Sequence, residues 1–268
     1  MARFHFENTA SGETFELAGT PPFDVAGLLP DGTYMVSALS AAAPTPMVIA
    51  SSPTAPVAED AMDAHWLFGP DAASLGDLKT GASLTAGPAG AGSTFESNAV
   101  RIQGLGRGYL SDIAETADFT FCAVVQRTSA ASILGGTLGP QGGAPGWTVF
   151  TVSNDDLTIA RNGGSAPVVD GAMPTDYVFI GVSLNAAGDC VYFRGDQAGS
   201  LVTSLSEPRG AIAALPQALG GVHYGTIFNN DFRCAELMLS TGFTNAAELE
   251  NIYQRSITRM ADRSISLT

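Results

Sequence analysis

Apolar and polar residues alternate in short runs along most of the chain. In the clearest run, Phe119, Phe121, Ala123 and Val125 occupy every second position, and a β-strand directs such residues to one face of a sheet. Similar runs recur at intervals of roughly ten residues, without helical patterns between them. This spacing predicts an antiparallel sandwich or barrel. The other runs cover residues 99–102, 108–110, 147–152, 157–160, 177–184, 190–194 and 234–239.

Turn-forming residues separate these runs. Asn162-Gly163 lies between apolar runs and is typical of a β-hairpin. Two glycine-rich stretches, residues 104–108 and 135–136, superficially resemble phosphate-binding loops. No helical pattern follows either stretch and the lysine of a P-loop is missing, so both are predicted to be β-turns.

One helix is predicted near the end of the chain. Asn245 can cap its first turn, and Glu248 three residues later completes the pattern of a capping box. Arginines toward its C-terminal end suit the helix dipole. The apolar residues that share one face of this helix are Leu249, Ile252, Tyr253, Ile257 and Met260.

Composition divides the chain into four parts. Residues 1–40 are predicted to form a small β module, and residues 41–60 are rich in Pro, Ala and Ser, which is typical of an extended linker. Residues 61–263 contain the repeated strand runs and the helix. Residues 264–268 are expected to be a tail or a strand added to a neighbour. Because so short a module has a marginal core, we expect it to pack on the large domain or on a partner chain.

The charge balance excludes several kinds of partner. Asp and Glu outnumber Lys and Arg by 26 to 12, which gives a formal net charge of −14. Nucleic-acid binding requires a basic surface, so we expect none. The acidity also repels anionic membranes and anionic polysaccharides unless a cation intervenes. No apolar run approaches the roughly 20 residues of a membrane span, so membrane insertion is not expected.

The alternation begins directly at Met1, which predicts that the chain has no signal peptide and is made and assembled in a cytoplasm. Cys122, Cys190 and Cys234 are odd in number, far apart and set in apolar runs. They are therefore predicted to be buried free thiols. A zinc site would need close Cys and His pairs, and the sequence has none.

Catalytic patterns are weak. Of the three histidines, His5 and His65 are expected to pack in strands beside aromatic residues, and His223 to lie on a loop. No Gly-x-Ser-x-Gly string supplies a serine nucleophile. A retaining glycosidase needs two carboxylates about 5 Å apart, but the acidic string of residues 59–63 has the wrong spacing and falls in the predicted linker. We therefore predict that the protein is not an enzyme.

Two kinds of residue are candidates for ligand binding. Trp147 and Tyr224 lie near loops and could stack on a sugar ring, although core packing would also explain Trp147. Asn229, Asn230 and Asp231 offer hard oxygen atoms. A possible calcium site is predicted at Asn154, Asp155 and Asp156, and turn formation alone would also explain both polar strings.

The order of these pieces resembles the laminin-G-like, concanavalin A-like jelly-roll domains. The resemblance covers roughly residues 62–257. It rests on the opening strand at residues 65–68, the strand and Gly-containing turn at 99–104, the central strand at 118–125, the aromatic turn at 192–195, and the closing strand-then-helix pattern from 235 to 253. It implies an all-β antiparallel sandwich that binds carbohydrate, mediates adhesion or is structural.

The layout of a small N-terminal module, a linker and such a domain resembles bacteriophage tail-fibre, head-fibre and baseplate proteins. This resemblance implies a virion protein, a homotrimer anchored through residues 1–40, whose jelly roll meets a host-surface glycan. A capsid-decorating or baseplate protein without a ligand is one alternative. A polysaccharide-degrading enzyme on the same fold is another.

Overall fold

The structure is a computed structural model of the chain. It describes residues 58–128, 131–139, 145–151, 156–161, 168–196, 199–206, 210–224 and 229–267, and before residue 58 the backbone of four strands. For residues 156, 168–172 and 205–206 it describes the backbone alone. The chain divides into two compact units, Met1–Val57 and Ala58–Thr268.

The first unit contains a four-stranded antiparallel sheet in the order β2-β1-β3-β4. Its last strand lies inside the predicted linker, so the boundary placed at residue 40 falls too early. Pro46 pairs with Met35 on this edge strand, a position that tolerates proline because its missing N–H would face outward. The strands are β1 (Ala2–Asn8), β2 (Thr14–Gly19), β3 (Gly32–Ala38) and β4 (Thr45–Ile49).

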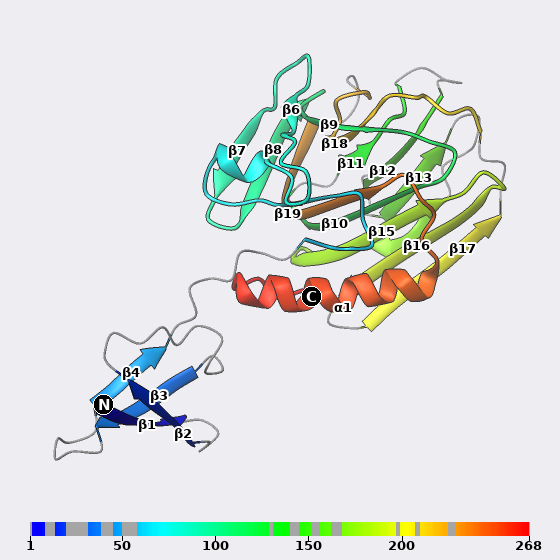
Figure 1. Ribbon diagram of the computed structural model, residues 1–268. Helices are drawn as coiled ribbons and strands as arrows, with labels where there is room; N and C mark the ends of the chain where they lie inside the picture. Colours follow the sequence, from blue (N-terminus) through cyan, green and yellow to red (C-terminus); the bar gives the residue numbers. More distant parts are fainter. Residues whose placement is uncertain are drawn as a thin grey trace. The chain divides into compact units, whose positions relative to one another are not determined.

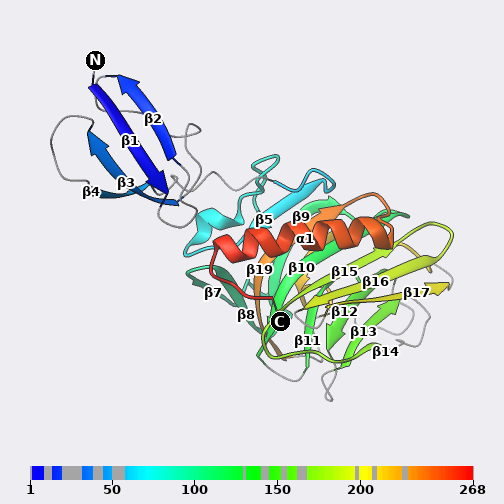
Figure 2. The same ribbon diagram turned by 90° about the horizontal axis from the view of Figure 1, so that it is seen from below.

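The second unit is an antiparallel β-sandwich, which confirms the expected fold class (Figures 1 and 2). One sheet has eight strands, in the order β17-β16-β15-β10-β19-β8-β7, with β5 also paired to β19. The other has seven, in the order β14-β13-β12-β11-β18-β9-β6. Neighbours far apart in sequence, such as β8 beside β19, create the jelly-roll crossovers.

Each predicted run overlaps a strand, whereas β6, β7, β11, β14, β17 and β18 were not predicted. The strands of the eight-stranded sheet are β5 (Ala64–Leu67), β7 (Ser93–Glu96), β8 (Ala99–Leu105), β10 (Phe119–Arg127), β15 (Tyr177–Leu184), β16 (Asp189–Asp196), β17 (Gly199–Ser206) and β19 (Asn229–Ser240). Those of the seven-stranded sheet are β6 (Thr85–Ala86), β9 (Gly108–Ala114), β11 (Ser132–Gly136), β12 (Trp147–Thr151), β13 (Asp156–Arg161), β14 (Val168–Ala172) and β18 (Pro216–Gly220). A short 3-10 helix, η1 (Ala72–Leu75), follows β5.

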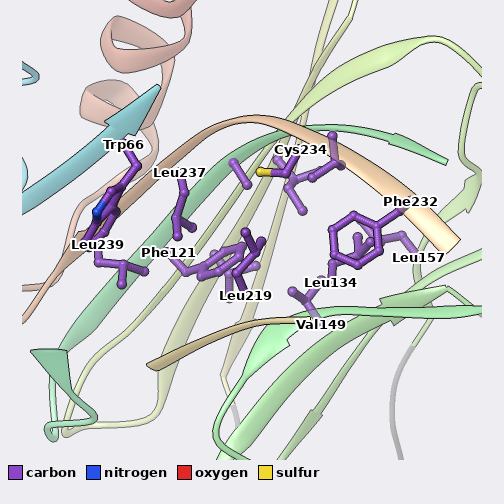
Figure 3. Packing of buried hydrophobic residues seen from close by; sticks show 14 of the residues in the cluster. Trp66, Phe121, Leu134, Val149, Leu157, Leu219, Phe232, Cys234, Leu237 and Leu239 are labelled. Carbon is purple, nitrogen blue, oxygen red and sulfur yellow. The ribbon is translucent and has the colours of Figure 1, made fainter. Parts of the chain in front are cut away.

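The main core lies between the two sheets (Figure 3). The inward positions of each strand supply it, as alternation requires: Phe121 from β10 lies beside Leu219 from the opposite sheet, and Phe232 from β19 lies near Leu134 and Val149. All three cysteines are buried and form no disulfide in the described part of the chain, as predicted, and burial raises the pKa of the Cys122 and Cys234 thiols. These thiols are therefore packing residues, because the reactive form of cysteine is the thiolate.

A second apolar cluster joins the outer face of the eight-stranded sheet to the predicted helix, α1 (Ala246–Asp262). The helix lies across that face, over β15 and β16 (Figures 1 and 2). The side chain of Asn245 accepts a hydrogen bond from the N–H of Glu248 at 3.0 Å and so caps the first turn. The predicted helix and its cap are confirmed. No helix in the described part of the chain is long and apolar enough to span a membrane.

The predicted tail at residues 264–268 is instead part of the folded unit, as far as residue 267. Ile265 and Leu267 are buried against the second cluster, and Leu267 forms a parallel bridge with Tyr177. The guanidinium of Arg263 donates to the carbonyl oxygens of Ala235 and Asn98, each at 2.8 Å. The end of the chain is held because apolar burial and these hydrogen bonds act together.

Candidate functional site

Trp147 does not lie on the surface, so the prediction that it stacks on a sugar is wrong. Its side chain is fully buried between the sheets, where its ring stacks on Phe119 with centroids 4.5 Å apart. The edge of Phe121 meets it from a second side, at 5.4 Å. The alternative interpretation as a core residue is the one that the structure supports.

The predicted polar ligand string at the start of β19 is split by strand alternation. Asn230 is buried and accepts a hydrogen bond from the N–H of Ile133 at 2.8 Å, which ties β19 to the opposite sheet. The carboxylate of Asp231 accepts two hydrogen bonds from Arg101, both at 2.8 Å, and this pairing helps to hold its pKa below the usual value. Asn229 alone is exposed. The three side chains therefore do not converge on one ligand.

The predicted calcium site falls largely outside the described residues. Asn154 and Asp155 are not described, and for Asp156 only the backbone at the start of β13 is. In the described part of the chain, no group of three or more His, Cys, Asp or Glu side chains could hold a metal ion.

Tyr224 and Asn229 are brought near a residue that the sequence did not single out, Arg107. It lies in the two-residue connection between β8 and β9. The predicted β-turn at residues 135–136 is wrong, because both glycines belong to strand β11. The carbonyl of Arg107 accepts the N–H of Gly221 at 3.0 Å, and the carbonyl of Gly221 accepts the N–H of Tyr224 at 3.1 Å. Leu105, two residues earlier, pairs with Asn229 across the β8–β19 ladder. We call Leu105, Arg107, Tyr224 and Asn229 the Arg107 surface.

The side chain of Arg107 lies in a trough of three glycines. A Cβ atom on Gly90 would be 2.5 Å from its Nη1, one on Gly92 would be 2.7 Å from its Cγ, and one on Gly104 would be 3.0 Å from its Cγ. All three glycines have positive φ angles, of 86°, 58° and 105°, which other residues rarely adopt. Leu105 is half exposed, at 50%, and Arg107 and Tyr224 are partly exposed. The surface therefore combines a cation, an aromatic ring, an amide and an apolar side chain.

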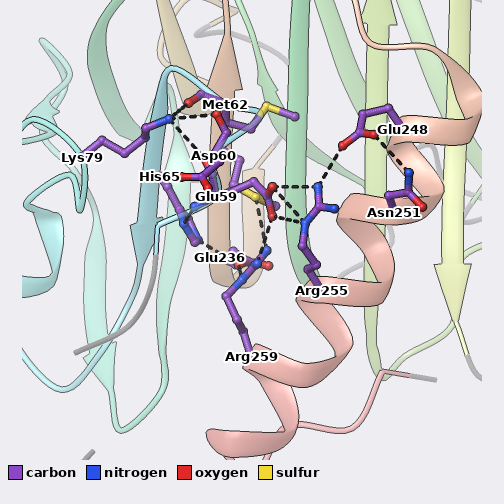
Figure 4. Close-up of polar contacts among 11 residues, drawn as sticks. Glu59, Asp60, Met62, His65, Lys79, Glu236, Glu248, Asn251, Arg255 and Arg259 are labelled. Atoms are coloured by element: carbon purple, nitrogen blue, oxygen red, sulfur yellow. Dashed lines mark hydrogen bonds and ion pairs between the residues drawn. The ribbon is translucent and has the colours of Figure 1, made fainter. Parts of the chain in front are cut away.

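A second polar group, the buried charge cluster, lies beneath α1 and consists of Glu59, His65, Glu236, Arg255 and Arg259 (Figure 4). Arg259 bridges both carboxylates, through Nη1 to Glu59 at 3.0 Å and through Nε to Glu236 at 2.6 Å. Arg255 adds a 2.8 Å ion pair to Glu59. The acidic string at residues 59–63 is thus part of the folded unit, contrary to its predicted place in the linker.

His65 lies on strand β5, as predicted, and the hydrogen bonds of its ring are made within this cluster. Its Nδ1 accepts the backbone N–H of Glu59 at 2.9 Å. The proton must therefore be on Nε2, which donates to Glu236 at 2.8 Å. Both ring nitrogens are occupied and the ring is fully buried, which fixes the tautomer and leaves no nitrogen for substrate.

The cluster also holds its carboxylates in the ionised form. Burial raises the pKa of Glu236, but the hydrogen bond from His65 and the charge of Arg259 outweigh burial and leave the pKa below its usual value. Burial also raises the pKa of Glu59, but the hydrogen bonds and charges of Arg255 and Arg259 outweigh burial and lower it. Arg255 is exposed at the edge of the cluster, and the other charges are largely buried and paired. Buried, paired charges of this kind hold elements together. Here they fix the start of the second unit to α1 and β19.

His223 and a groove beside α1 give less information about a functional site. His223, the predicted loop histidine, donates from Nε2 to the carbonyl of Pro216 at 2.8 Å. An open groove of about 630 Å³ lies beside the last turns of α1 and is lined by Asp196, Tyr253, Ile257 and the segment 264–267. The carboxylate of Asp196 pairs with Arg194 at 3.1 Å, so that charge is already neutralised.

Comparisons with known proteins identify similarities in fold alone. No family model and no curated protein matches the chain. Trypanosoma rangeli sialidase has a TM-score of 0.55 at 13% identity, over 77% of this chain and 34% of the sialidase. The ligand-binding domain of botulinum neurotoxin serotype D, in complex with N-acetylneuraminic acid, has a TM-score of 0.53 at 9% identity, over 75% of this chain and 52% of that one. The chain thus spans about a third to a half of these structures, and the likeness shows a β-sandwich consistent with the expected concanavalin A-like jelly roll.

Proposed function

We propose that the second unit is a carbohydrate-binding domain and that the Arg107 surface contacts the glycan. The observation that carries this proposal is the arrangement of Arg107, Tyr224, Asn229 and Leu105 around one turn of the sandwich. A partly exposed ring can pack on the apolar face of a sugar, while amide and guanidinium groups bind its oxygen atoms. The botulinum neurotoxin domain, which has a similar fold, is in complex with a sugar acid.

A glycan array tests this proposal with the labelled full-length chain. We expect binding to a restricted set of glycans, and Tyr224→Ala to weaken it by about tenfold, the effect of losing one aromatic contact of about 1.4 kcal/mol. Tyr109→Phe is a matched control, because Tyr109 is buried in the core and lies off the surface. Binding to no glycan would favour the alternative of a structural protein without a ligand.

We also propose that the domain is not an enzyme, although sialidases have a similar fold. A glycosidase needs a general acid whose pKa is raised. The buried carboxylates Glu59 and Glu236 have lowered pKa values and are ion-paired, which supports a role in binding the fold together. Incubating the purified chain with the glycans that it binds should release no reducing sugar. Release of reducing sugar by the purified chain would contradict this proposal.

The two-unit layout supports a place in a larger particle. We propose that the first unit joins the chain to a virion, as in bacteriophage fibres, and that the chain is a homotrimer assembled in the host cytoplasm. Light scattering of the full chain and of a chain without residues 1–57 tests this. A trimer that becomes a folded monomer after truncation supports the proposal, whereas a monomer in both cases contradicts the self-sufficient trimer.

A further inference from the structure

Among the residues that the structure describes, none neutralises the charge of Arg107. No hydrogen bond or ion pair reaches its guanidinium from any residue that the structure describes. By contrast, Arg101 and Arg233 on the same sandwich each pair with a carboxylate, Asp231 and Glu96 respectively. The chain has 26 acidic residues against 12 basic ones, so internal partners are abundant. An unpaired arginine in such a chain points to an external anion.

The side chain of Arg107 is packed against glycines before any ligand arrives. Its stem lies against Gly92 and Gly104 and its Nη1 against Gly90, where added side-chain atoms would crowd it. Packing restricts the rotamers of the stem, and a preorganised donor loses less conformational freedom on binding. Its carbonyl is fixed by Gly221, and Asn230 adds a weaker hydrogen bond at 3.5 Å. The position of the charge is therefore set by the fold.

We infer that the Arg107 surface recognises the carboxylate of an acidic sugar residue; this rests on the proposed function. The planar guanidinium matches a carboxylate through two parallel hydrogen bonds. Tyr224 and Asn229, from the segments that adjoin the Arg107 turn, offer a ring for the sugar face and an amide for its hydroxyl groups, and Leu105 offers an apolar contact. The net charge of −14 repels extended polyanions. The ligand is therefore a glycan with a single terminal acidic sugar.

The test compares terminal acidic glycans with the same glycans after methyl esterification of the carboxyl group, using the full-length chain on an array. Esterification removes the charge and keeps the sugar. We expect esterified glycans to bind at least tenfold more weakly than the acids. We expect Arg107→Gln to weaken binding of the acids to the same extent and to leave binding of the esters unchanged. The matched control Arg101→Gln removes the same charge on the outer sheet face and should bind like the native chain.

A second variant displaces the charge without removing it. In Gly90→Ala the new Cβ would lie 2.5 Å from Nη1 of Arg107, so the guanidinium must move. Gly81→Ala is its control, because Gly81 has a similar positive φ of 75° with nothing within 4 Å of the added atom. We expect Gly90→Ala to lose the preference for acids over esters and Gly81→Ala to retain it. Thermal unfolding confirms that each variant is folded.

The outcomes separate this inference from the proposed function. If acids and esters bind equally, or if Arg107→Gln retains the preference for acids, the inference is wrong and glycan binding stands. A preference for sulfated neutral glycans over carboxylated ones also overturns it. If no glycan binds, the proposed function fails and the inference fails with it.

Discussion

Arginine has opposite roles in two regions of this molecule. In the buried charge cluster, Arg259 is largely enclosed and contacts two carboxylates at once. At the Arg107 surface, the guanidinium is partly exposed and has no partner in the described part of the chain. The first arrangement leaves no charge available for a ligand, and the second leaves its charge available. The difference teaches that burial and pairing, rather than residue type, separate charges that stabilise the fold from charges that recognise a ligand.

The largest effect is expected at the centre of the buried cluster. Glu236→Ala leaves Arg259 without one of its two counter-charges and His65 without an acceptor for its Nε2–H. Removing one partner of a buried ion pair costs about 3–5 kcal/mol of unfolding free energy, which urea denaturation measures. Asp231→Ala is a matched control on the same strand, because it breaks a partly exposed pair with Arg101 that contributes about 1 kcal/mol or less. Equal losses in the two variants would contradict the distinction between the regions.

The sequence predicts those features of the fold that depend on residues close together along the chain. The cap of α1 is visible in Asn245 and Glu248, three positions apart, and the strands are visible in two-residue alternation. The buried cluster could not be predicted, because its contacts join residues such as Glu59 and Arg255, which are 196 positions apart. His65 and Glu236 are likewise separated by 171 positions. Only the crossing of β5, β19 and α1 brings these residues together.

The candidate site was only partly predictable for a related reason. Tyr224 lies near a loop and Asn229 offers a hard oxygen atom, which the sequence alone reveals, and both lie on the Arg107 surface. Trp147 also lies near a loop, but alternation does not reveal which face of a strand meets the core. Arg107 itself looked like one residue of a glycine-rich turn. Its trough depends on Gly90 and Gly92, which belong to a different segment of the chain.

Acidification should weaken the buried cluster in a predictable direction. The pKa values of Glu59 and Glu236 lie below their ordinary value of 4.5 in the folded chain. The unfolded chain therefore takes up protons first as the pH falls, and the stabilisation present above about pH 5 is lost progressively as the pH passes through the lower folded values. Urea unfolding between pH 7 and pH 3 measures this loss. Glu236→Gln, which cannot take up a proton there, should show a shallower decline below about pH 5. A decline as steep as that of the native chain would place the acid sensitivity elsewhere.

The smallest effect on stability is expected at Arg107. This prediction tests the contrast between the Arg107 surface and the buried charge cluster most directly. Arg107→Gln removes no internal hydrogen bond or ion pair in the described part of the chain, so the free energy of unfolding should change by no more than about 0.5 kcal/mol. Arg259→Gln removes a similar charge but breaks contacts to both Glu59 and Glu236, and about 3 kcal/mol or more should be lost. Urea denaturation of the two variants side by side measures this difference. A loss of about 2 kcal/mol for Arg107→Gln would mean that Arg107 stabilises the turn, and its unpaired charge would then no longer indicate a ligand.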